Sequence, residues 1–376
     1  MPRTIIDLHL LHTVPPSNLN RDDTGSPKTA IFGGVRRARV SSQAWKHAAR
    51  EAFRGYLDFS ELGTRTKRVV ELIAERVLDA TPDATEEEAL VFAEKALTAT
   101  GIKVKESRGK DGPKETGYLL FLSNQQIAAL GELASEALRD QAEVDRREAQ
   151  GLIKGKNSVD LALFGRMVAD VSDLNVDASC QVAHALSTHG VEFEYDYFTA
   201  VDDVKAGTAE EDAGAGMIGT VEFNSATLYR YATLDIDSLN ASLGDLRATV
   251  RAASAFLQAF VKSMPTGKQN TFANRTLPEL VVVCLRDDRP VSWVGAFEEP
   301  VVASTQGGYV SRSTARLVEY AKAVDLTYGS PPVACFTTGI GTIGETVAVL
   351  GDSLPLDNAV RALEELLEQR LLGAAS

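Results

Sequence analysis

The sequence has little cysteine and lacks a long hydrophobic run. Its three cysteines, Cys180, Cys284 and Cys335, lie far apart in a chain of 376 residues and form no C-x-x-C pair. This spacing argues against a zinc site or a redox couple and fits a reducing, cytoplasmic setting. No stretch approaches the roughly 18 apolar residues of a membrane-spanning helix. We therefore expect neither a signal peptide nor a membrane span.

The motifs of several common enzyme classes are also missing. The sequence has no G-x-x-x-x-G-K-[ST], G-x-S-x-G or H-E-x-x-H pattern. Residues 339–344 match G-x-G-x-x-G, but Gly351 and Pro355 follow too soon for the crossover helix of a dinucleotide-binding unit. A glycine-rich turn is the better interpretation, and a nicotinamide-dependent enzyme remains the weaker alternative.

Histidines and carboxylates give no convincing metal or catalytic cluster. His184 and His189 are five residues apart, which on one helix separates them by about 140° and disfavours a shared metal. The adjacent Asp202 and Asp203 resemble turn residues more than the metal-spaced carboxylates of a nuclease. We expect no cofactor and no metal, and a nuclease remains an alternative.

Positive charge is scarce overall and concentrated in one segment. The chain has 39 basic and 52 acidic residues and a net charge of −13, yet eight basic and only three acidic residues lie between Arg21 and Arg54. A basic segment on an acidic protein predicts one dedicated groove for an anionic partner. The alternative is an ordinary solvated surface loop.

Local patterns around this basic segment predict a strand, a loop and a helix. The strand covers residues 4–14 and ends at two prolines. A polar, glycine-containing loop follows over residues 17–40. An amphipathic helix then begins at Ser41 or Ser42, with a basic stripe that includes Lys46 and Arg50.

The rest of the chain predicts an inserted helical unit, a hairpin arm and a second run of strands and helices. Residues 57–180 are acidic and rich in alanine. Their pattern predicts helices over 66–80, 85–100 and 124–150 and a mobile loop over 103–117. Strands over 193–201 and 218–223 flank an acidic tip and form the arm. Later strands (227–236, 280–285 and 333–337) alternate with helices (245–263, 313–324 and 356–372), which indicates an α/β or α+β core.

Several polar and aromatic residues favour binding of single-stranded nucleic acid. The basic loop and the helix start combine positive charge, hydrogen-bond donors and a helix N-terminus, which together suit phosphate oxygens. A second polar loop over residues 265–275 adds Lys268, Gln269 and Arg275. On the arm, Tyr197 and Phe198 are suited to stack on bases or to wedge between them. These patterns alone do not distinguish RNA from DNA.

Multi-residue blocks across the chain resemble the CasC (Cse-type) backbone subunits of the type I-E CRISPR Cascade complex. The N-terminal blocks are LNRDD at 19–23, AIFGG at 30–34, the arginines near 36–39 and SSQ at 41–43. The later blocks are GRM at 165–167, HALSTH at 184–189, FTAVDD at 198–203 and YRYA at 229–232. The resemblance covers most of the chain and weakens after about residue 280.

This resemblance implies an α+β protein shaped like a right hand. Its palm is a modified RRM-like (ferredoxin-like) sheet, into which a helical fingers domain and a β-hairpin thumb are inserted. The corresponding segments are residues 1–58 (palm), 59–180 (fingers), 181–192 (palm), 193–221 (thumb) and 222–376 (palm).

The resemblance further implies a non-enzymatic, oligomerising scaffold that binds CRISPR RNA and presents it for pairing with invading DNA in antiviral defence. The expected partners are the CRISPR RNA, the target DNA strand, further copies of the chain, and the large, small, 5′-end cap and RNA-processing endonuclease subunits of Cascade. A membrane is not among them. Because backbone subunits of other CRISPR effector types cut RNA, an RNA-guided ribonuclease using the arm carboxylates is the main alternative.

The same resemblance assigns RNA-binding roles to individual residues. Those implied to hold the RNA backbone are Arg21, Lys28, Arg37, Arg39, Ser41, Gln43, Lys46 and Arg50. Val35 stands where relatives can carry lysine, and Arg36 and Arg37 are the substitutes for that contact. Met167, Phe198, Thr199 and Ile218 are implied to interrupt the base stack. Arg166, Tyr197, Lys268 and Gln269 complete the predicted RNA-binding set.

Overall fold

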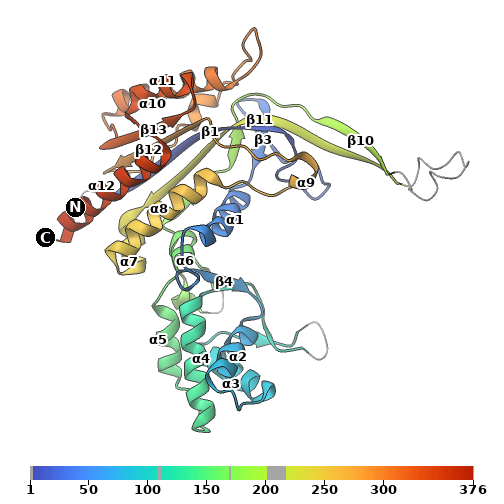
Figure 1. Cartoon of the computed structure of the whole chain (residues 1–376), viewed down its shortest axis with the longest axis vertical. Helices are drawn as coiled ribbons and strands as arrows, with labels where there is room; N and C mark the ends of the chain where they lie inside the picture. Colours follow the sequence, from blue (N-terminus) through green and yellow to red (C-terminus); the bar gives the residue numbers. More distant parts are fainter. Residues whose placement is uncertain (1–2, 108–111, 169–170, 201–216, 376) are drawn as a thin grey trace, which may run out of the picture. The chain divides into compact units, whose positions relative to one another are not determined.

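The computed structural model describes residues 3–107, 112–168, 171–200 and 217–375 (Figure 1). The chain divides into two compact units. The sheet unit comprises Met1–Ala52, Val182–Thr233 and Phe256–Ser376, and the helical unit comprises Phe53–Gln181 and Leu234–Ala255.

The sheet unit is built on one large sheet with the strand order β14-β13-β12-β1-β11-β9-β3-β2. These strands are β1 (Ile5–Ser17), β2 (Thr29–Phe32), β3 (Val35–Val40), β9 (Ala185–Ser187), β11 (Met217–Asp235), β12 (Leu280–Arg286), β13 (Ala334–Gly339) and β14 (Asp352–Ser353). β8 (Cys180–Val182) and β10 (Glu194–Ala200) also pair with β11.

The central strands follow the ferredoxin-like pattern. Along the chain the order is β1, α1 (Ser42–Ala52), β9, β11, α8 (Leu246–Lys262) and β12, and in the sheet these strands lie in the order β12-β1-β11-β9. A β-α-β-β-α-β sequence with this strand order defines the ferredoxin-like motif. The predicted α+β fold with an RRM-like sheet is confirmed.

β1 is buried on both faces because helices cover both sides of the sheet. Successive side chains of a strand point to opposite faces. On one face Leu11 belongs to an apolar cluster with Trp293 and with Leu317 of α10 (Val310–Tyr328). On the other face the His12 ring lies 6.2 Å from the ring of Trp45 in α1. Figure 1 shows α10 and α1 on opposite sides of the sheet.

Two expectations for the N-terminal region are wrong. β1 continues through both prolines to Ser17, beyond the stretch Ile5–Leu11 that pairs with β12, so neither proline has to supply an N–H to β12. The predicted loop over residues 17–40 contains the β2–β3 hairpin. Gly33 and Gly34 have φ of 58° and 74°, as a tight hairpin turn requires. A Cβ on Gly33 would also lie 1.7 Å from the Glu298 carbonyl oxygen.

The remaining helices of the sheet unit lie in its C-terminal part. They are α9 (Gln269–Phe272), α10, α11 (Thr342–Val347) and α12 (Leu356–Ala375), with short 3₁₀ turns at η5 (Val294–Phe297) and η6 (Ala348–Leu350). The predicted helices over 313–324 and 356–372 are confirmed by α10 and α12, each longer than the pattern indicated.

The helical unit has its own core, formed mainly where α2, α3 and α4 pack together. Its helices are α2 (Val69–Ala80), α3 (Glu86–Ala99), α4 (Asn124–Arg139), α5 (Arg146–Lys154), α6 (Val159–Phe164) and α7 (Ile236–Leu243), with 3₁₀ turns η1 (Phe53–Gly55), η2 (Phe59–Glu61) and η3 (Ser172–Leu174). Its short strands are β4 (Gly63–Thr66), β5 (Val104–Lys105), β6 (Glu115–Thr116) and β7 (Leu120–Ser123).

Two details of the helical unit differ from expectation. The helix predicted over 124–150 is two helices, because Gln141 adopts a positive φ of 49° and the Asp145 side chain caps the start of α5 by accepting from the Glu148 N–H. The predicted loop over 103–117 contains the β5–β6 pair at its ends. Among the described helices, none is long and apolar enough to cross a membrane.

The hairpin arm is formed by β10 and the first part of β11. The two strands are antiparallel, with Glu194 opposite Phe223 and Ala200 opposite Met217 (Figure 1). The predicted acidic tip over residues 205–216 lies outside the described residues.

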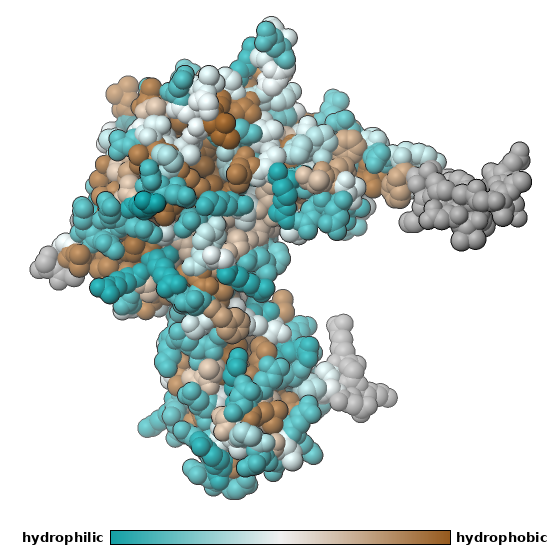
Figure 2. Space-filling model, in the orientation of Figure 1, coloured by the Kyte–Doolittle hydropathy of each residue, from teal (hydrophilic) through white to brown (hydrophobic). Residues whose placement is uncertain are grey.

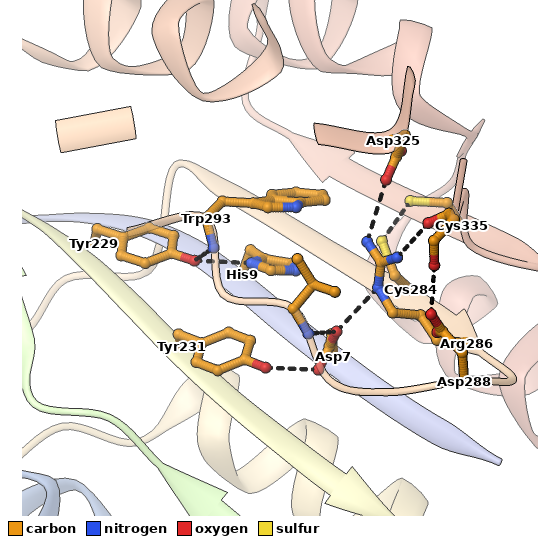
Figure 3. Close-up of polar contacts among 12 residues, drawn as sticks. Asp7, His9, Tyr229, Tyr231, Cys284, Arg286, Asp288, Trp293, Asp325 and Cys335 are labelled. Atoms are coloured by element: carbon orange, nitrogen blue, oxygen red, sulfur yellow. Dashed lines mark hydrogen bonds and ion pairs between the residues drawn. The ribbon is translucent and has the colours of Figure 1, made fainter. Parts of the chain in front are cut away.

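A buried ionic network joins β1 to β12 and to the segment that follows it (Figure 3). The Asp7 carboxylate accepts from Arg286 Nε at 3.1 Å, from the Tyr231 hydroxyl at 2.8 Å and from the Val291 N–H at 2.9 Å. Arg286 also donates to the Ser330 carbonyl oxygen at 2.9 Å. Burial raises the pKa of Asp7 above its ordinary value, although these donors favour the carboxylate.

Arg286→Met should lower the stability of the sheet unit by about 3–5 kcal/mol, because it leaves the Asp7 carboxylate buried without its guanidinium. Urea unfolding followed by tryptophan fluorescence measures this effect, since Trp45 and Trp293 both lie in the sheet unit. The double variant Asp7→Asn/Arg286→Met should recover part of the loss. The stability lost on adding Asp7→Asn to Arg286→Met is compared with the stability lost on Asp7→Asn in the wild type. If the two losses are equal, the two side chains are not coupled.

Candidate nucleic-acid interface

Hydrogen bonds in the basic segment bring Lys28 and Arg39 next to each other. The Lys28 N–H donates to the Asn20 carbonyl oxygen at 2.8 Å, and the Arg39 N–H donates to the Lys28 carbonyl oxygen at 2.9 Å. Arg39 Nε donates to the Thr29 carbonyl oxygen at 3.2 Å, which orients the guanidinium. Two cations that are far apart in the sequence pattern are therefore neighbours in the fold.

His184 joins this pair at the N-terminus of α1. The Ser42 N–H donates to His184 Nδ1 at 3.0 Å, so in the neutral ring the proton is on Nε2. Partial desolvation and the charges of Arg39 and Lys28 lower the pKa of His184 below its ordinary value. Arg39 lies in β3 just before α1, and Asn20 accepts from the Lys28 N–H with its carbonyl oxygen and from the Ser41 N–H with its side-chain oxygen at 2.9 Å. Both cations therefore lie near the start of α1, where the helix dipole favours an anion.

His184 was not predicted as part of this site, because its spacing from His189 was considered only for a shared metal. Ser42 and His184 are 142 positions apart, and no spacing rule connects them. The one available signal was the block at 184–189, which carries the resemblance but assigned no role to the histidine.

Most predicted RNA-backbone residues have side chains that reach the surface of the sheet unit. Arg21, Arg36 and Gln43 are exposed; Lys28, Arg39, Lys46, Arg50, Lys268 and Gln269 are partly exposed. Ser41 is buried, and its hydroxyl accepts from the Ala44 N–H at 3.3 Å, as the cap of α1. Its predicted role as a phosphate donor is therefore replaced by a capping role.

Arg37 was predicted to contact RNA, and the structure corrects this. The side chain is fully buried, and its nitrogens donate to the carbonyl oxygens of Phe32, Ser187, Phe297 and Glu298 at 3.0–3.3 Å. Strand alternation explains the difference from Arg36, which points to the opposite face of β3 and is exposed. Arg37 ties the β2–β3 hairpin to the segment after η5.

Arg166 of the helical unit is corrected in the same way. Its side chain is 6% exposed and donates to the carbonyl oxygens of Leu174, Phe121 and Ile153 and to the side-chain oxygen of Gln126. Burial lowers the pKa of Arg166 to about 10. By contrast, the adjacent Met167 is 84% exposed, so it remains available as an apolar contact.

The aromatic residues of the arm lie on opposite faces of the hairpin. Tyr197 stands opposite Thr220 and is 63% exposed, whereas Phe198 stands opposite Gly219 and is 38% exposed. A Cβ on Gly219 would lie 2.4 Å from the Phe198 ring, so only glycine lets the ring lie flat across the strand. The backbones of Thr199 and Ile218 are also opposed. Figure 2 shows apolar residues on the surface of the arm.

The second polar loop packs against the first. A Cβ on Gly267 would lie 2.2 Å from the Leu19 carbonyl oxygen, so the chain before Lys268 and Gln269 touches the start of the basic segment. A groove of about 520 Å³ lies here, lined by residues 19–25 and Gly267. Arg275 donates to the Gln269 side-chain oxygen. The fold therefore brings together the two polar loops that the sequence analysis singled out.

The enzyme alternatives rest on the glycine-rich segment, the paired aspartates and the residue types that bind metals. Residues 339–344 run from the end of β13 through a turn into α11, a helix of six residues, and a Cβ on Gly339 would lie 2.6 Å from the Gly344 backbone. Asp202 and Asp203 lie outside the described residues. Within the described part of the chain, no group of three or more histidine, cysteine or carboxylate side chains is placed to hold a metal ion.

Fold and surface together define a ferredoxin-like α+β protein with a cationic site at a helix N-terminus. Residues 6–363 match the model of the CT1975-like protein family, and the chain belongs to this family. A search of curated proteins gives no match.

Two solved structures are similar over nearly the whole chain. A chain of a "CRISPR RNA-guided surveillance complex, pre-nicking" is 32% identical with a TM-score of 0.85, covering 96% of this chain and 100% of that one. A chain of a "CRISPR RNA-guided surveillance complex" is 28% identical with a TM-score of 0.74, covering 95% and 99%.

The two neighbouring arginines of β3 provide a test of the burial assignment. Arg37→Ala should destabilise the sheet unit by at least about 2 kcal/mol, because it leaves several buried carbonyl oxygens without a donor. Arg36→Ala should change stability by no more than about 0.5 kcal/mol. Equal stabilities of the two variants in urea unfolding would contradict this assignment.

Proposed function

We propose that this protein is an RNA-binding subunit of a CRISPR RNA-guided surveillance complex. The observation that carries the proposal is the match of almost the entire chain to subunits of two such complexes, at 32% and 28% identity. The cationic site formed by Lys28, Arg39 and the N-terminus of α1 supports it independently, because a phosphodiester backbone requires positive charge and N–H donors.

In finer detail, we propose a backbone subunit of the CasC type in a type I-E complex. Several copies bind successive stretches of one CRISPR RNA and present it for pairing with the target DNA strand. The other partners are the large, small, 5′-end cap and RNA-processing endonuclease subunits. The blocks of similarity in the first 50 residues and around 180–235 support this assignment.

The site is suited to hold the RNA by its phosphates and to leave the base edges free. Lys28 and Arg39 supply charge, the dipole of α1 adds to it, and the His184 Nε2–H supplies a directional donor. Such contacts are the same for every nucleotide and carry no sequence information. Sequence recognition is then delegated to base pairing between RNA and DNA.

On the arm, we assign the wedge between bases to Phe198 rather than to Tyr197. The Phe198 ring packs against the backbone of Gly219 on the neighbouring strand, whereas Tyr197 lies on the other face of the hairpin. A supported apolar ring can unstack a base step at a cost of a few kcal/mol, which phosphate contacts offset. In the helical unit, the exposed Met167 is the second apolar contact.

We further propose that the subunit acts as a scaffold and not as a catalyst. The site described above combines two cations with a helix dipole and the His184 Nε2–H, which are groups suited to binding an anion. The ribonuclease alternative rests on Asp202 and Asp203, and no feature of the described residues favours it.

The double variant Lys28→Ala/Arg39→Ala tests the proposed function directly. It should weaken binding of CRISPR RNA by at least about tenfold. It should also reduce the slope of log affinity against log salt by about 1.4, since each lost phosphate contact on single-stranded nucleic acid contributes about 0.7. Both effects should be the same for RNAs of different spacer sequence.

The matched control variant removes the same number of positive charges from a different face of the sheet unit. Arg289→Ala/Lys322→Ala removes two exposed cations near and on α10, which covers the opposite face of the sheet from α1. This variant should retain the wild-type salt slope. If both double variants lose the same slope, or if the wild type binds no RNA, the proposal fails.

His184 predicts a pH dependence of RNA binding. In the free protein its pKa lies below the ordinary value, so the ring is neutral at pH 7. A phosphate placed against Lys28 and Arg39 offsets their charge and raises this pKa, so binding takes up a proton as the pH falls. The proton adds at Nδ1 and replaces the hydrogen bond that Nδ1 accepts from the Ser42 N–H, which opposes part of this rise. Between about pH 7.5 and 5.5 the wild type should gain up to about tenfold more affinity than His184→Gln. Parallel pH profiles of the two proteins would contradict this role.

A further inference from the structure

Cys284 and Cys335 lie directly opposite each other on neighbouring strands. β12 and β13 are antiparallel, and the register pairs Cys284 with Cys335. The two Sγ atoms are 3.0 Å apart (Figure 3). Their separation along the chain argued against a redox couple, and this expectation is wrong because the fold brings the two sulfurs together.

We propose that these two cysteines form a reversible intramolecular disulfide when the protein meets an oxidising small-molecule disulfide. Opposed side chains in an antiparallel pair point to the same face of the sheet, with Cβ atoms about 4.5–5.5 Å apart. A disulfide needs about 3.5–4.5 Å between Cβ atoms and about 2.0 Å between sulfurs. A small rotation of the two side chains and a slight approach of the strands meet these requirements.

The surroundings of the pair make the reaction slow and the product durable. Both side chains are buried, and the hydrogen bond with Cys335 together with burial raises the pKa of the Cys284 thiol well above its ordinary value. The thiolate, which is the reacting form, is therefore scarce. The same burial shields the disulfide from reductants once it has formed.

Access to the pair comes from the outer side of β13. On that side β14 pairs at Phe336–Asp352 and Thr337–Ser353. Gly351, just before β14, packs on the Cys335 backbone, where an added Cβ would lie 2.0 Å from the Cys335 carbonyl oxygen. This short strand and Gly351 must therefore move aside before a reagent can reach Cys335. Local opening at this edge exposes Cys335 before Cys284, which is held between β1 and β13. Cys335 is thus the thiol that reacts first.

The chemistry is two thiol–disulfide exchanges. The Cys335 thiolate attacks one sulfur of the small disulfide, whose S–S bond breaks and releases one thiol. The Cys284 thiolate then attacks Cys335 Sγ in this mixed disulfide and releases the second thiol. The protein loses two protons and two electrons, and the small disulfide gains them as two thiols.

Counting free thiols tests the proposal. The full chain is incubated with oxidised glutathione in mildly alkaline buffer, unfolded, alkylated with N-ethylmaleimide and weighed by mass spectrometry. Three labels are expected before oxidation and one afterwards, mapped to Cys180, the third buried cysteine. Treatment of the unfolded protein with dithiothreitol before alkylation should restore all three labels.

The variants Cys284→Ser and Cys335→Ser test whether the loss of labels comes from a bridge between these two cysteines. Each should keep its Cys180 label and form no internal disulfide, and neither should show the rise in melting temperature expected of the oxidised wild type. A parallel incubation in urea below the unfolding transition increases opening of the edge. If the wild type keeps three labels there too, or if Cys180 takes part in the bridge, the proposal is wrong. No step involves RNA, so this result is independent of the proposed function.

Discussion

The burial of β1 on both faces is the constraint on which the rest of the sheet unit depends. Asp7, His9 and His12 have no access to water there, so each must find a partner inside the protein. Asp7 binds Arg286 of β12, His9 bonds to the Tyr229 hydroxyl of β11 at 2.9 Å, and His12 contacts Arg230 of β11 at 3.0 Å. These three pairings fix both neighbours of β1 in register.

The same constraint reaches the candidate interface through Arg230. Its guanidinium is buried between the rings of Trp45 in α1 and Phe260 in α8, at 3.7 and 4.5 Å from their centroids. Burial lowers the pKa of Arg230 to about 9, so the group stays protonated at pH 7. Because Trp45 lies near the start of α1, this stacked cation helps to hold the helix N-terminus that His184, Lys28 and Arg39 surround.

The sequence predicted the elements with strong periodicity and missed those that depend on distant contacts. The helices over 66–80, 85–100 and 245–263 appear nearly as expected as α2, α3 and α8, because an apolar stripe at helical spacing is a local signal. The β2–β3 hairpin was missed although Gly33-Gly34 between two short extended runs is its usual mark. The break at Gln141 has no comparable local signal.

For the site, the sequence located the basic segment correctly but did not separate its members by role. Arg36 and Arg37 are the same residue type and adjacent in the chain. Strand alternation nevertheless places Arg36 at the surface and Arg37 in the interior, where it donates to four carbonyl oxygens. A count of charges treats both as contacts for an anion. Since the buried arginines hold the hairpin and the helix that present the exposed cations, the two groups are mechanically linked. Part of the positive charge in this segment therefore builds the surface, and another part, including Lys28 and Arg39, lies on that surface.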